Sequence, residues 1–124
     1  MNNHAETLQV KQVMQNYMDG SFQVDIEKLK SAFHANAVMN GYLGPECVLA
    51  TPAAFIDDIA SAPSMASQGD AYQAEIESIR IEGNVAAVVV SETGFRGSAT
   101  LVDFFHLIKT DGEWKIISKL FTTL

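Results

Sequence analysis

The last fifty residues constrain the fold more than any other part of the sequence. Four apolar runs follow one another there, and each break between them is two residues long and contains a glycine: Gly83-Asn84, Arg96-Gly97 and Asp111-Gly112. Short glycine-containing breaks between strand-like runs are typical of β-hairpins, and Asp-Gly is the strongest of these turn signals. We therefore predict four consecutive antiparallel strands.

The turns also predict how these strands pair, because opposite residues can be counted back from each turn. The last turn sets Lys109 against Trp114, Leu107 against Ile116, Phe105 against Ser118 and Asp103 against Leu120. The turn before it sets Val90 beside Asp103 and Val88 beside Phe105. One face then carries Asp103 as its only acid on the last three strands, among Val88, Val90, Phe105, Leu107, Trp114, Ile116 and Leu120.

The opposite face of these strands is also largely apolar. It collects Val102, Phe104, His106, Ile108, Ile117, Lys119 and Phe121. A sheet with helices on one side normally shows water a polar outer face, so this sheet is expected to be covered twice. The simplest second cover is another copy of the chain, which predicts a homodimer with His106 at its interface. A single bulge would exchange the two faces.

The first half of the chain predicts helices. Residues 5 to 19 have amphipathic helical spacing that ends at Asp19-Gly20. A second helix begins after Asp25, a residue favoured at helix N-caps, and the two helices are expected to pack as a pair.

The segment that follows alternates between short elements and a loop. Residues 37 to 43 predict a short strand, and residues 47 to 50 predict another. Thr51 is expected to cap a third helix with Pro52 at its first position. Residues 63 to 70 are small and polar, which favours a loop that could close over an opening.

Length and composition exclude several classes of protein. The 124 residues fit one domain, 1–124. The net charge is −7 and the eight Lys and Arg residues are scattered, which disfavours nucleic-acid binding. No apolar run approaches the ~20 residues of a membrane helix, so no membrane partner is expected. The lone Cys47 cannot form an internal disulfide, and we expect a cytoplasmic location.

Two segments resemble a known family. These are "YMDGSFQVDIEKLKSAFHANAVM" near the start and "VDFFHLIKTDGEWKIISKLF" near the end. With the order of elements above, they resemble the nuclear transport factor 2-like superfamily, and within it the putative lumazine-binding branch. Polyketide cyclases and ketosteroid isomerase share this cystatin-like cone fold. The resemblance implies an α+β fold, with three helices packed on a curved, mainly antiparallel sheet around a conical pocket, usually in a dimer.

Asp103 is the leading candidate for a functional residue. An ionised carboxylate loses several kcal/mol of hydration when it is buried without partners, so Asp103 is expected either to have partners or to have a role. In an apolar pocket its pKa would rise, and it could act as a general base or a hydrogen-bonding acid. The alternative is a structural carboxylate paired with a cation, a tyrosine or a backbone amide. Lys119 lies on the opposite face in the predicted register.

Other side chains are weaker candidates. His34 is expected at the end of the second helix near the mouth of the cone, where it could shuttle protons or stabilise the helix C-terminus. Tyr17 and Tyr42 could each point a phenol into the cavity. Catalysis would require a second carboxylate, and the sequence offers Asp19, Asp25, Glu46, Asp57 and Asp58. Phe33, Met39, Phe55, Phe105 and Trp114 could line a ligand, although core packing explains them as well.

Three functions follow from these candidates. The first is a small-molecule-binding protein with an apolar conical pocket for a pterin-, steroid- or polyketide-like ligand. The second is an isomerase, cyclase or hydrolase that uses Asp103 as acid or base. The third is a dimeric accessory domain without a ligand. No cofactor is expected, and the separated His and Cys residues predict no metal site.

Overall fold

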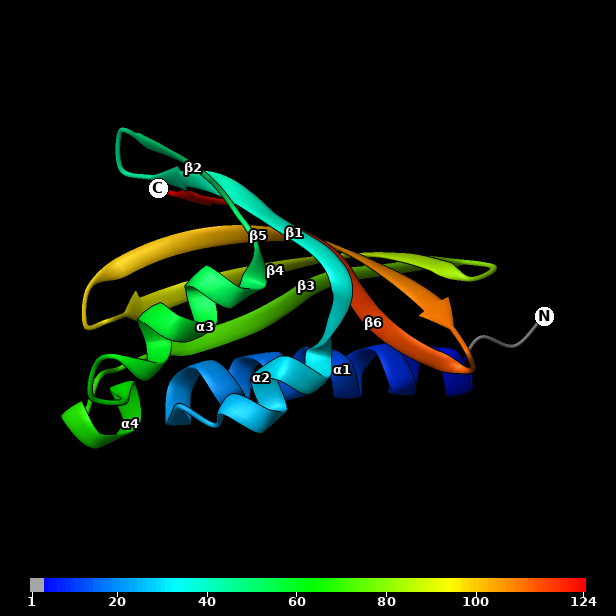
Figure 1. Cartoon of the computed structure of the whole chain (residues 1–124), viewed down its shortest axis with the longest axis horizontal. Helices are drawn as coiled ribbons and strands as arrows, with labels where there is room; N and C mark the ends of the chain where they lie inside the picture. Colours follow the sequence, from blue (N-terminus) through cyan, green and yellow to red (C-terminus); the bar gives the residue numbers. More distant parts are fainter. Residues whose placement is uncertain (1–3) are drawn as a thin grey trace.

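A computed structural model describes residues 4–124 as four helices and one six-stranded sheet (Figure 1). The helices are α1 (His4–Gln23), α2 (Ile26–Ala32), α3 (Pro52–Ala60) and α4 (Met65–Gln68). The strands are β1 (Phe33–Leu43), β2 (Glu46–Ala50), β3 (Gln73–Glu82), β4 (Val85–Phe95), β5 (Ala99–Thr110) and β6 (Glu113–Thr123). The α+β fold predicted from the sequence is therefore confirmed.

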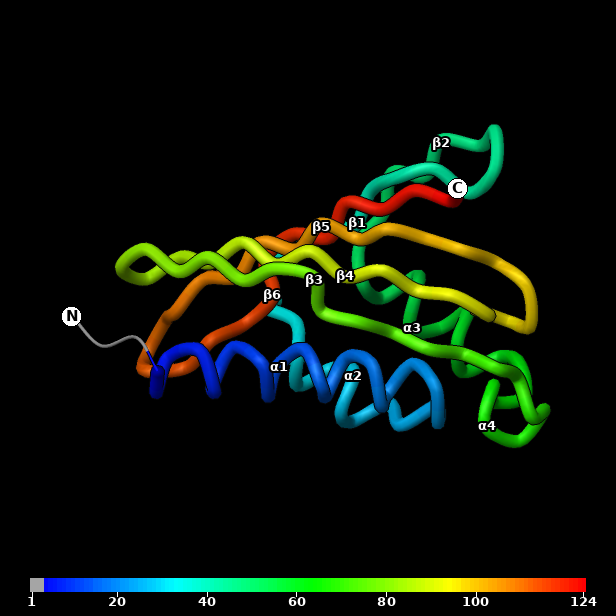
Figure 2. The backbone as a smooth tube through the Cα atoms, turned by 180° about the vertical axis from the view of Figure 1, so that it is seen from behind, coloured from blue at the N-terminus to red at the C-terminus, as the bar shows by residue number. Residues whose placement is uncertain are grey.

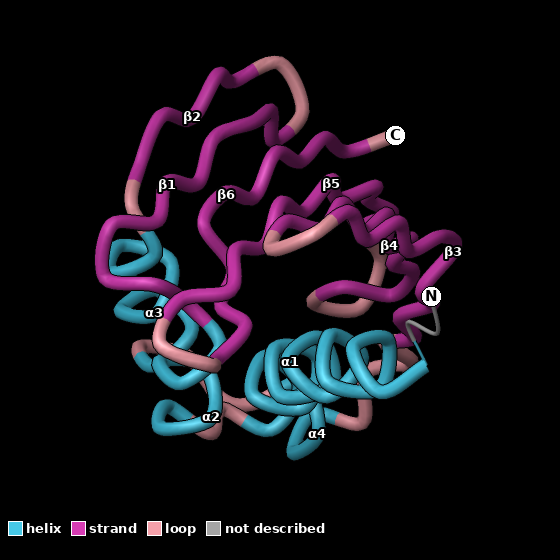
Figure 3. Tube along the Cα trace, turned by 90° about the vertical axis from the view of Figure 1, so that its right-hand side faces the viewer, coloured by secondary structure: helices cyan, strands magenta, loops and turns pink. Residues whose placement is uncertain are grey.

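The sheet is mixed and strongly curved. Its strand order is β2-β1-β6-β5-β4-β3, and every neighbouring pair is antiparallel except β1 and β6, which are parallel. The strands arch around an interior that α1 and α2 close from the other side (Figure 3). Most of the apolar core lies between these two layers.

The first two helices pack side by side, but α1 is longer than the sequence predicts (Figure 2). It was expected to end at Asp19-Gly20, and it continues through Gly20 to Gln23. A Cβ on Gly20 would lie 2.8 Å from Leu29 Cγ, so the glycine permits α2 to approach closely and does not end the helix. Asp25 is the N-cap of α2 as predicted, and its Oδ1 accepts a hydrogen bond from Lys28 N at 3.2 Å.

Two expectations for the middle of the chain are corrected. The strand predicted at residues 37 to 43 begins earlier, at Phe33, and directly follows α2. The segment predicted as a loop, residues 63 to 70, contains the short helix α4, whose Met65 is buried.

The four-stranded meander at the end of the chain is confirmed. Asp111 and Gly112 have φ angles of 51° and 78°, the positive values that a two-residue hairpin turn requires at both positions. Lys109 pairs with Trp114 and Leu107 with Ile116 as predicted. The pairing of Asp103 with Val90 is also as predicted.

A β-bulge makes the rest of the predicted pairing of β5 with β6 wrong. The register shifts after Leu107, leaving Ile117 unpaired, so that Phe105 lies opposite Lys119 and Asp103 opposite Phe121. One extra residue reverses the faces of all later residues in a strand. Lys119 is therefore 4% exposed inside the protein, whereas Leu120, predicted to face inward, is 54% exposed.

The bulge also changes the predicted dimer face. Lys119 and Phe121 do not belong to the outer face, because both side chains are buried on the inner face. Phe104, His106 and Leu120 are exposed on the outer face. In the part of the chain that the structure describes, no helix is long and apolar enough to cross a membrane.

Candidate functional site

Asp103 lies at the centre of the interior, as the strand alternation predicts. Its side chain is 0% exposed, and no donor within residues 4–124 makes a hydrogen bond to either carboxylate oxygen. The Nζ atom of Lys119 is 3.9 Å from its Oδ2, which is an ion pair without a close hydrogen bond. Buried polar groups nearly always have hydrogen-bond partners, so Asp103 is an exception that requires an explanation.

Lys119 is the cation of this site, and the bulge in β6 turns it inward. Its Nζ donates a hydrogen bond to the Tyr17 hydroxyl at 2.6 Å. Four aromatic rings surround the ammonium, with centroids at 4.7 Å (Phe55), 4.9 Å (Tyr17), 5.2 Å (Phe121) and 6.0 Å (Phe105). Ring faces attract a cation, and the attraction is stronger where water is excluded. These contacts offset part of the cost of burying the charge.

A second carboxyl group, Glu92, completes the cluster and was missed from the sequence. It is 2% exposed, and it lies on the same face of β4 as Val90 and Val88, two and four residues earlier. The expectation that Asp103 is the only acid on this face is therefore wrong. Simple alternation along β4 contains the signal that would have identified Glu92.

Tyr72 connects Glu92 of this cluster to Phe22 of α1. Its hydroxyl donates a hydrogen bond to Glu92 Oε2, and its ring stacks on Phe22 at 5.8 Å. A Cβ on Gly94, whose φ is 66°, would lie 2.2 Å from the Ala71 carbonyl oxygen. Only glycine allows this close approach, which brings Tyr72 over Glu92.

The neighbouring groups control the charge of Asp103. Burial raises the pKa of Asp103 to about 8; the Lys119 ammonium opposes this rise, and hydrogen bonding and repulsion from Glu92 add to it. With a pKa of about 8, Asp103 carries a proton for most of the time at neutral pH.

The two tyrosines remain neutral. Burial, followed by the charges of Glu92 and Asp103, raises the pKa of Tyr17 well above its usual range. Burial and Glu92 also raise the pKa of Tyr72. The cluster therefore combines an ammonium, two carboxyls and two phenols, all within an apolar shell.

A cavity of about 270 Å³ lies directly beside this cluster, between α3 and the β1–β2 hairpin. It is lined by Met39, Leu43, Val48, Ala50, Ala54, Phe55, Asp58 and Phe121. Phe55 and Phe121 belong to both the cavity and the polar cluster, because they line the cavity and also flank the Lys119 ammonium. These two rings separate the cavity from the cluster.

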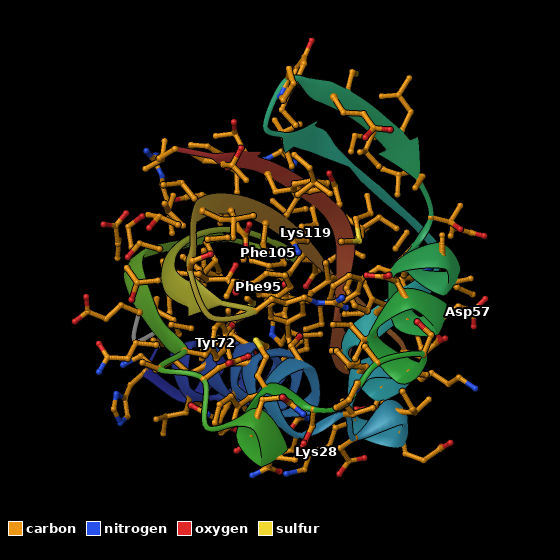
Figure 4. All side chains as sticks on the ribbon, turned by 90° about the vertical axis from the view of Figure 1, so that its left-hand side faces the viewer. Lys28, Asp57, Tyr72, Phe95, Phe105 and Lys119 are labelled. Atoms are coloured by element: carbon orange, nitrogen blue, oxygen red, sulfur yellow. The ribbon has the colours of Figure 1, made fainter. Side chains whose placement is uncertain are left out.

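The structure brings several predicted site residues to this region. Lys119 and Phe105 point into the interior in Figure 4. Tyr17 contacts Phe105 and Phe33 edge to face, with ring centroids 5.0 and 6.1 Å apart, and stacks with Phe55 at 6.2 Å.

Three predicted site residues lie elsewhere. Tyr42 is 49% exposed and lines a hollow on the outer face, so its predicted inward orientation is wrong. His34 lies on β1 and not at a helix end, and its Nδ1 accepts a hydrogen bond from Asn36 N at 3.0 Å. Trp114 is buried at the far end of the core and donates its indole N–H to Glu6 at 2.6 Å.

The carboxylates that the sequence offered as partners of Asp103 do not reach it. Asp57, for example, points outward from α3 in Figure 4, and the second carboxyl of the cluster is Glu92. Within residues 4–124, no group of three or more His, Cys, Asp or Glu side chains could hold a metal ion.

This arrangement, in which a curved sheet encloses a cavity and a buried polar cluster, defines the cone-shaped α+β class of nuclear transport factor 2-like proteins. The family described as "Putative lumazine-binding" matches residues 5–122, and the chain belongs to that family. No curated protein matches the chain.

Solved structures support the same fold. An NTF2-like protein of unknown function from Shewanella baltica OS155 superposes with a TM-score of 0.87 at 22% identity, covering 100% of this chain and 98% of that one. Another, from Methylobacillus flagellatus KT, has a TM-score of 0.83 at 26% identity and covers 98% and 94%. A "putative dehydratase" of the same family from Streptomyces avermitilis has a TM-score of 0.69 at 14% identity and covers 99% of each chain.

Proposed function

We propose that this protein binds a small, mainly apolar molecule whose oxygen atom is held by Lys119 and Tyr17. The observation that carries the proposal is the double role of Phe55 and Phe121, which form a wall of the cavity and half of the aromatic cage around Lys119. A rotation of the Phe55 ring would open the cavity toward the Lys119 ammonium. Phe55 is only partly buried on α3, and the movement would break its contacts with Tyr17 and Lys119.

The size and lining of the cavity support a small ligand. Its volume of about 270 Å³ is close to the lower end of the range of small-molecule pockets, ~300 Å³. The lining is mostly apolar, and the polar donors lie at the inner end. This distribution fits a flat apolar body with a carbonyl or hydroxyl oxygen, a description shared by pterin-, steroid- and polyketide-like molecules.

A binding screen tests this proposal. Thermal shift and calorimetry with oxygen-bearing aromatic and polycyclic compounds should find ligands that stabilise the protein. A ligand at 100 times its dissociation constant adds ~2.7 kcal/mol. The Phe121→Ala variant should weaken binding at least tenfold, whereas Leu8→Ala, on the exposed surface of α1, should have no effect. Equal affinity of both variants and the wild type would contradict this location of the site.

An enzyme is the second candidate, and one specific observation favours it. Asp103 is buried without a hydrogen-bond donor, and its pKa of about 8 would allow proton exchange near neutral pH. An isomerase, cyclase or hydrolase could use such a group as acid or base. For any substrate found by the screen, Asp103→Asn should abolish turnover while retaining affinity. Unchanged turnover would restrict the protein to binding.

We also propose a homodimer formed through the outer sheet face, in a cytoplasmic protein. Two hollows of about 430 and 340 Å³ lie on this face, and Val85, Phe104 and Leu120 are exposed beside them. A second copy of the chain fits best, because a two-fold axis supplies an equally apolar surface without requiring another partner. Light scattering should give twice the mass of one chain, and Phe104→Asp should give the monomer. A wild-type monomer at high concentration would contradict the proposal.

A further inference from the structure

We propose that Lys119 forms a reversible imine with an aldehyde or ketone that occupies the cavity between α3 and the β1–β2 hairpin. This inference rests on the proposed binding function and specifies its chemistry. It requires an amine that can lose a proton, a nearby group that accepts the proton, and access for a carbonyl carbon.

Lys119 has the apolar surroundings that are typical of nucleophilic lysines. Lysines that form such adducts lie in apolar pockets. Lys119 is 4% exposed and is surrounded by four aromatic rings. Phe55 and Phe121, which flank the Lys119 ammonium, also line an apolar cavity.

Asp103 is suited to accept and return the proton. Its Oδ2 is 3.9 Å from Lys119 Nζ, and neither of its oxygens accepts a hydrogen bond from the residues described. The other groups that face it are Glu92 from β4 and the phenols of Tyr17 and Tyr72. A carboxylate with a pKa of about 8 is a stronger base than an ordinary one, so ionised Asp103 can take a proton from the ammonium.

The reaction balances without any other reagent. The Asp103 carboxylate takes one proton from the Lys119 ammonium, and the neutral amine adds to the carbonyl carbon to form a carbinolamine. The Tyr17 hydroxyl, 2.6 Å from Nζ, is placed to hydrogen-bond the carbinolamine oxygen. Asp103 returns its proton to that oxygen, which leaves as water, and the product is a protonated imine. One carbonyl compound and one ammonium thus give one iminium and one water.

The cage that holds the ammonium also suits the product. The positive charge is conserved in the reaction and remains on the nitrogen, within reach of the Tyr17, Phe105 and Phe121 rings and of the Asp103 carboxylate. Burial of the charge is therefore not an additional penalty for the adduct. The bond forms when Phe55 turns away and the carbonyl carbon reaches Nζ.

Reductive trapping tests the proposal. The whole chain is incubated at pH 8 with benzaldehyde and cyanoborohydride, which reduces an iminium to a stable secondary amine, and the modified lysine is identified by peptide mass spectrometry. The other five lysines, Lys11, Lys28, Lys30, Lys109 and Lys115, are all more exposed and serve as internal controls. We expect Lys119 to react at least tenfold faster than any of them. Modification in the order of exposure, with Lys119 last, would overturn the proposal.

Variants separate the imine from simple binding. Lys119→Arg keeps the charge and should lose the adduct, and Asp103→Asn should slow trapping at least tenfold, with circular dichroism confirming the fold. Phe55→Ala opens the wall and should accelerate trapping. Benzyl alcohol, which cannot form an imine, measures non-covalent binding. Binding of benzyl alcohol without trapping of benzaldehyde would refute the imine alone, whereas failure of both would refute the proposed binding function as well.

Discussion

Two polar clusters contain a buried or partly buried carboxylate next to a lysine, and they are built in opposite ways. At the start of α1, Glu6 accepts hydrogen bonds from Lys109 at 2.7 Å and from Trp114 at 2.6 Å, one on each oxygen. In the interior, Asp103 accepts none and has Lys119 at 3.9 Å. The pKa of Glu6 is lowered, chiefly by its hydrogen bonds to Lys109 and Trp114, whereas burial raises that of Asp103 to about 8.

The difference indicates which cluster has a structural role. Glu6 joins the first turn of α1 to the β5–β6 hairpin, and its complete set of hydrogen bonds explains its presence. Asp103 contributes no comparable link, and its burial is unfavourable to stability. A site that keeps polar atoms unpartnered is suited to donate and accept hydrogen bonds when a ligand arrives.

The largest expected effect is the pH dependence of stability, which distinguishes the cluster around Asp103 from the one around Glu6. The folded pKa of Asp103, about 8, is above its ordinary value of 3.8, so its contribution to stability is complete below pH 3.8 and is lost as the pH rises to 8. Between pH 5 and 8 the wild type should lose about 4 kcal/mol more than Asp103→Asn does, because each pH unit between the two pKa values changes the stability by ~1.4 kcal/mol. Parallel pH profiles of the two proteins in urea unfolding would show that Asp103 titrates normally.

The second largest effect comes from removing Lys119, the cation of the cluster around Asp103. Lys119→Met should destabilise the protein by about 3 kcal/mol, because it leaves buried carboxyls without their positive charge. Urea unfolding at pH 7 measures the change. The double variant Lys119→Met/Asp103→Leu should recover part of the loss. If the double variant loses more than the single one, the two groups do not compensate each other.

A smaller loss of stability is expected from removing the hydroxyl of Tyr72, which contacts Glu92. Tyr72→Phe removes the donor to Glu92 and should destabilise the protein by about 1 kcal/mol, because a buried acceptor loses its partner. Chemical denaturation of this variant beside Phe22→Leu, which changes the ring that stacks on Tyr72, separates the hydrogen bond from the packing. If Tyr72→Phe leaves the free energy of unfolding unchanged, the hydrogen bond from Tyr72 to Glu92 does not stabilise the protein.

The smallest effect is expected for the cluster around Glu6. Its stability contribution changes with pH in the opposite direction to that of Asp103. The folded pKa of Glu6 is below its ordinary value of 4.5, so its contribution is complete above that pH and is lost as the pH falls further. Glu6→Gln should therefore be slightly less stable than the wild type at pH 7, and the difference should disappear in acid. Thermal unfolding from pH 7 to pH 3 measures this, and a difference that grows in acid would contradict the assignment.

The sequence predicted the fold better than the site, for reasons visible in single residues. The hairpin turns fixed the meander, and alternation on β5 placed Asp103 inside. The bulge at Ile117 has no local signature, because a run such as "KIISKLF" alternates acceptably in either register, so Lys119 was placed on the wrong face. Glu92 could have been found by alternation on β4. The approach of Tyr72 depends on tertiary packing around Gly94, which no local pattern encodes.

The proposed site depends above all on Asp103, which is buried beside Lys119 with a pKa of about 8. Carbon-13 NMR of the side-chain carboxyls, titrated from pH 3 to 10 in the wild type and in Asp103→Asn, measures this pKa. We expect one carboxyl that titrates near pH 8 in the wild type and is lost in the variant. Titration of Asp103 near pH 4 would show that its pKa is not raised and would remove it from the proposed site.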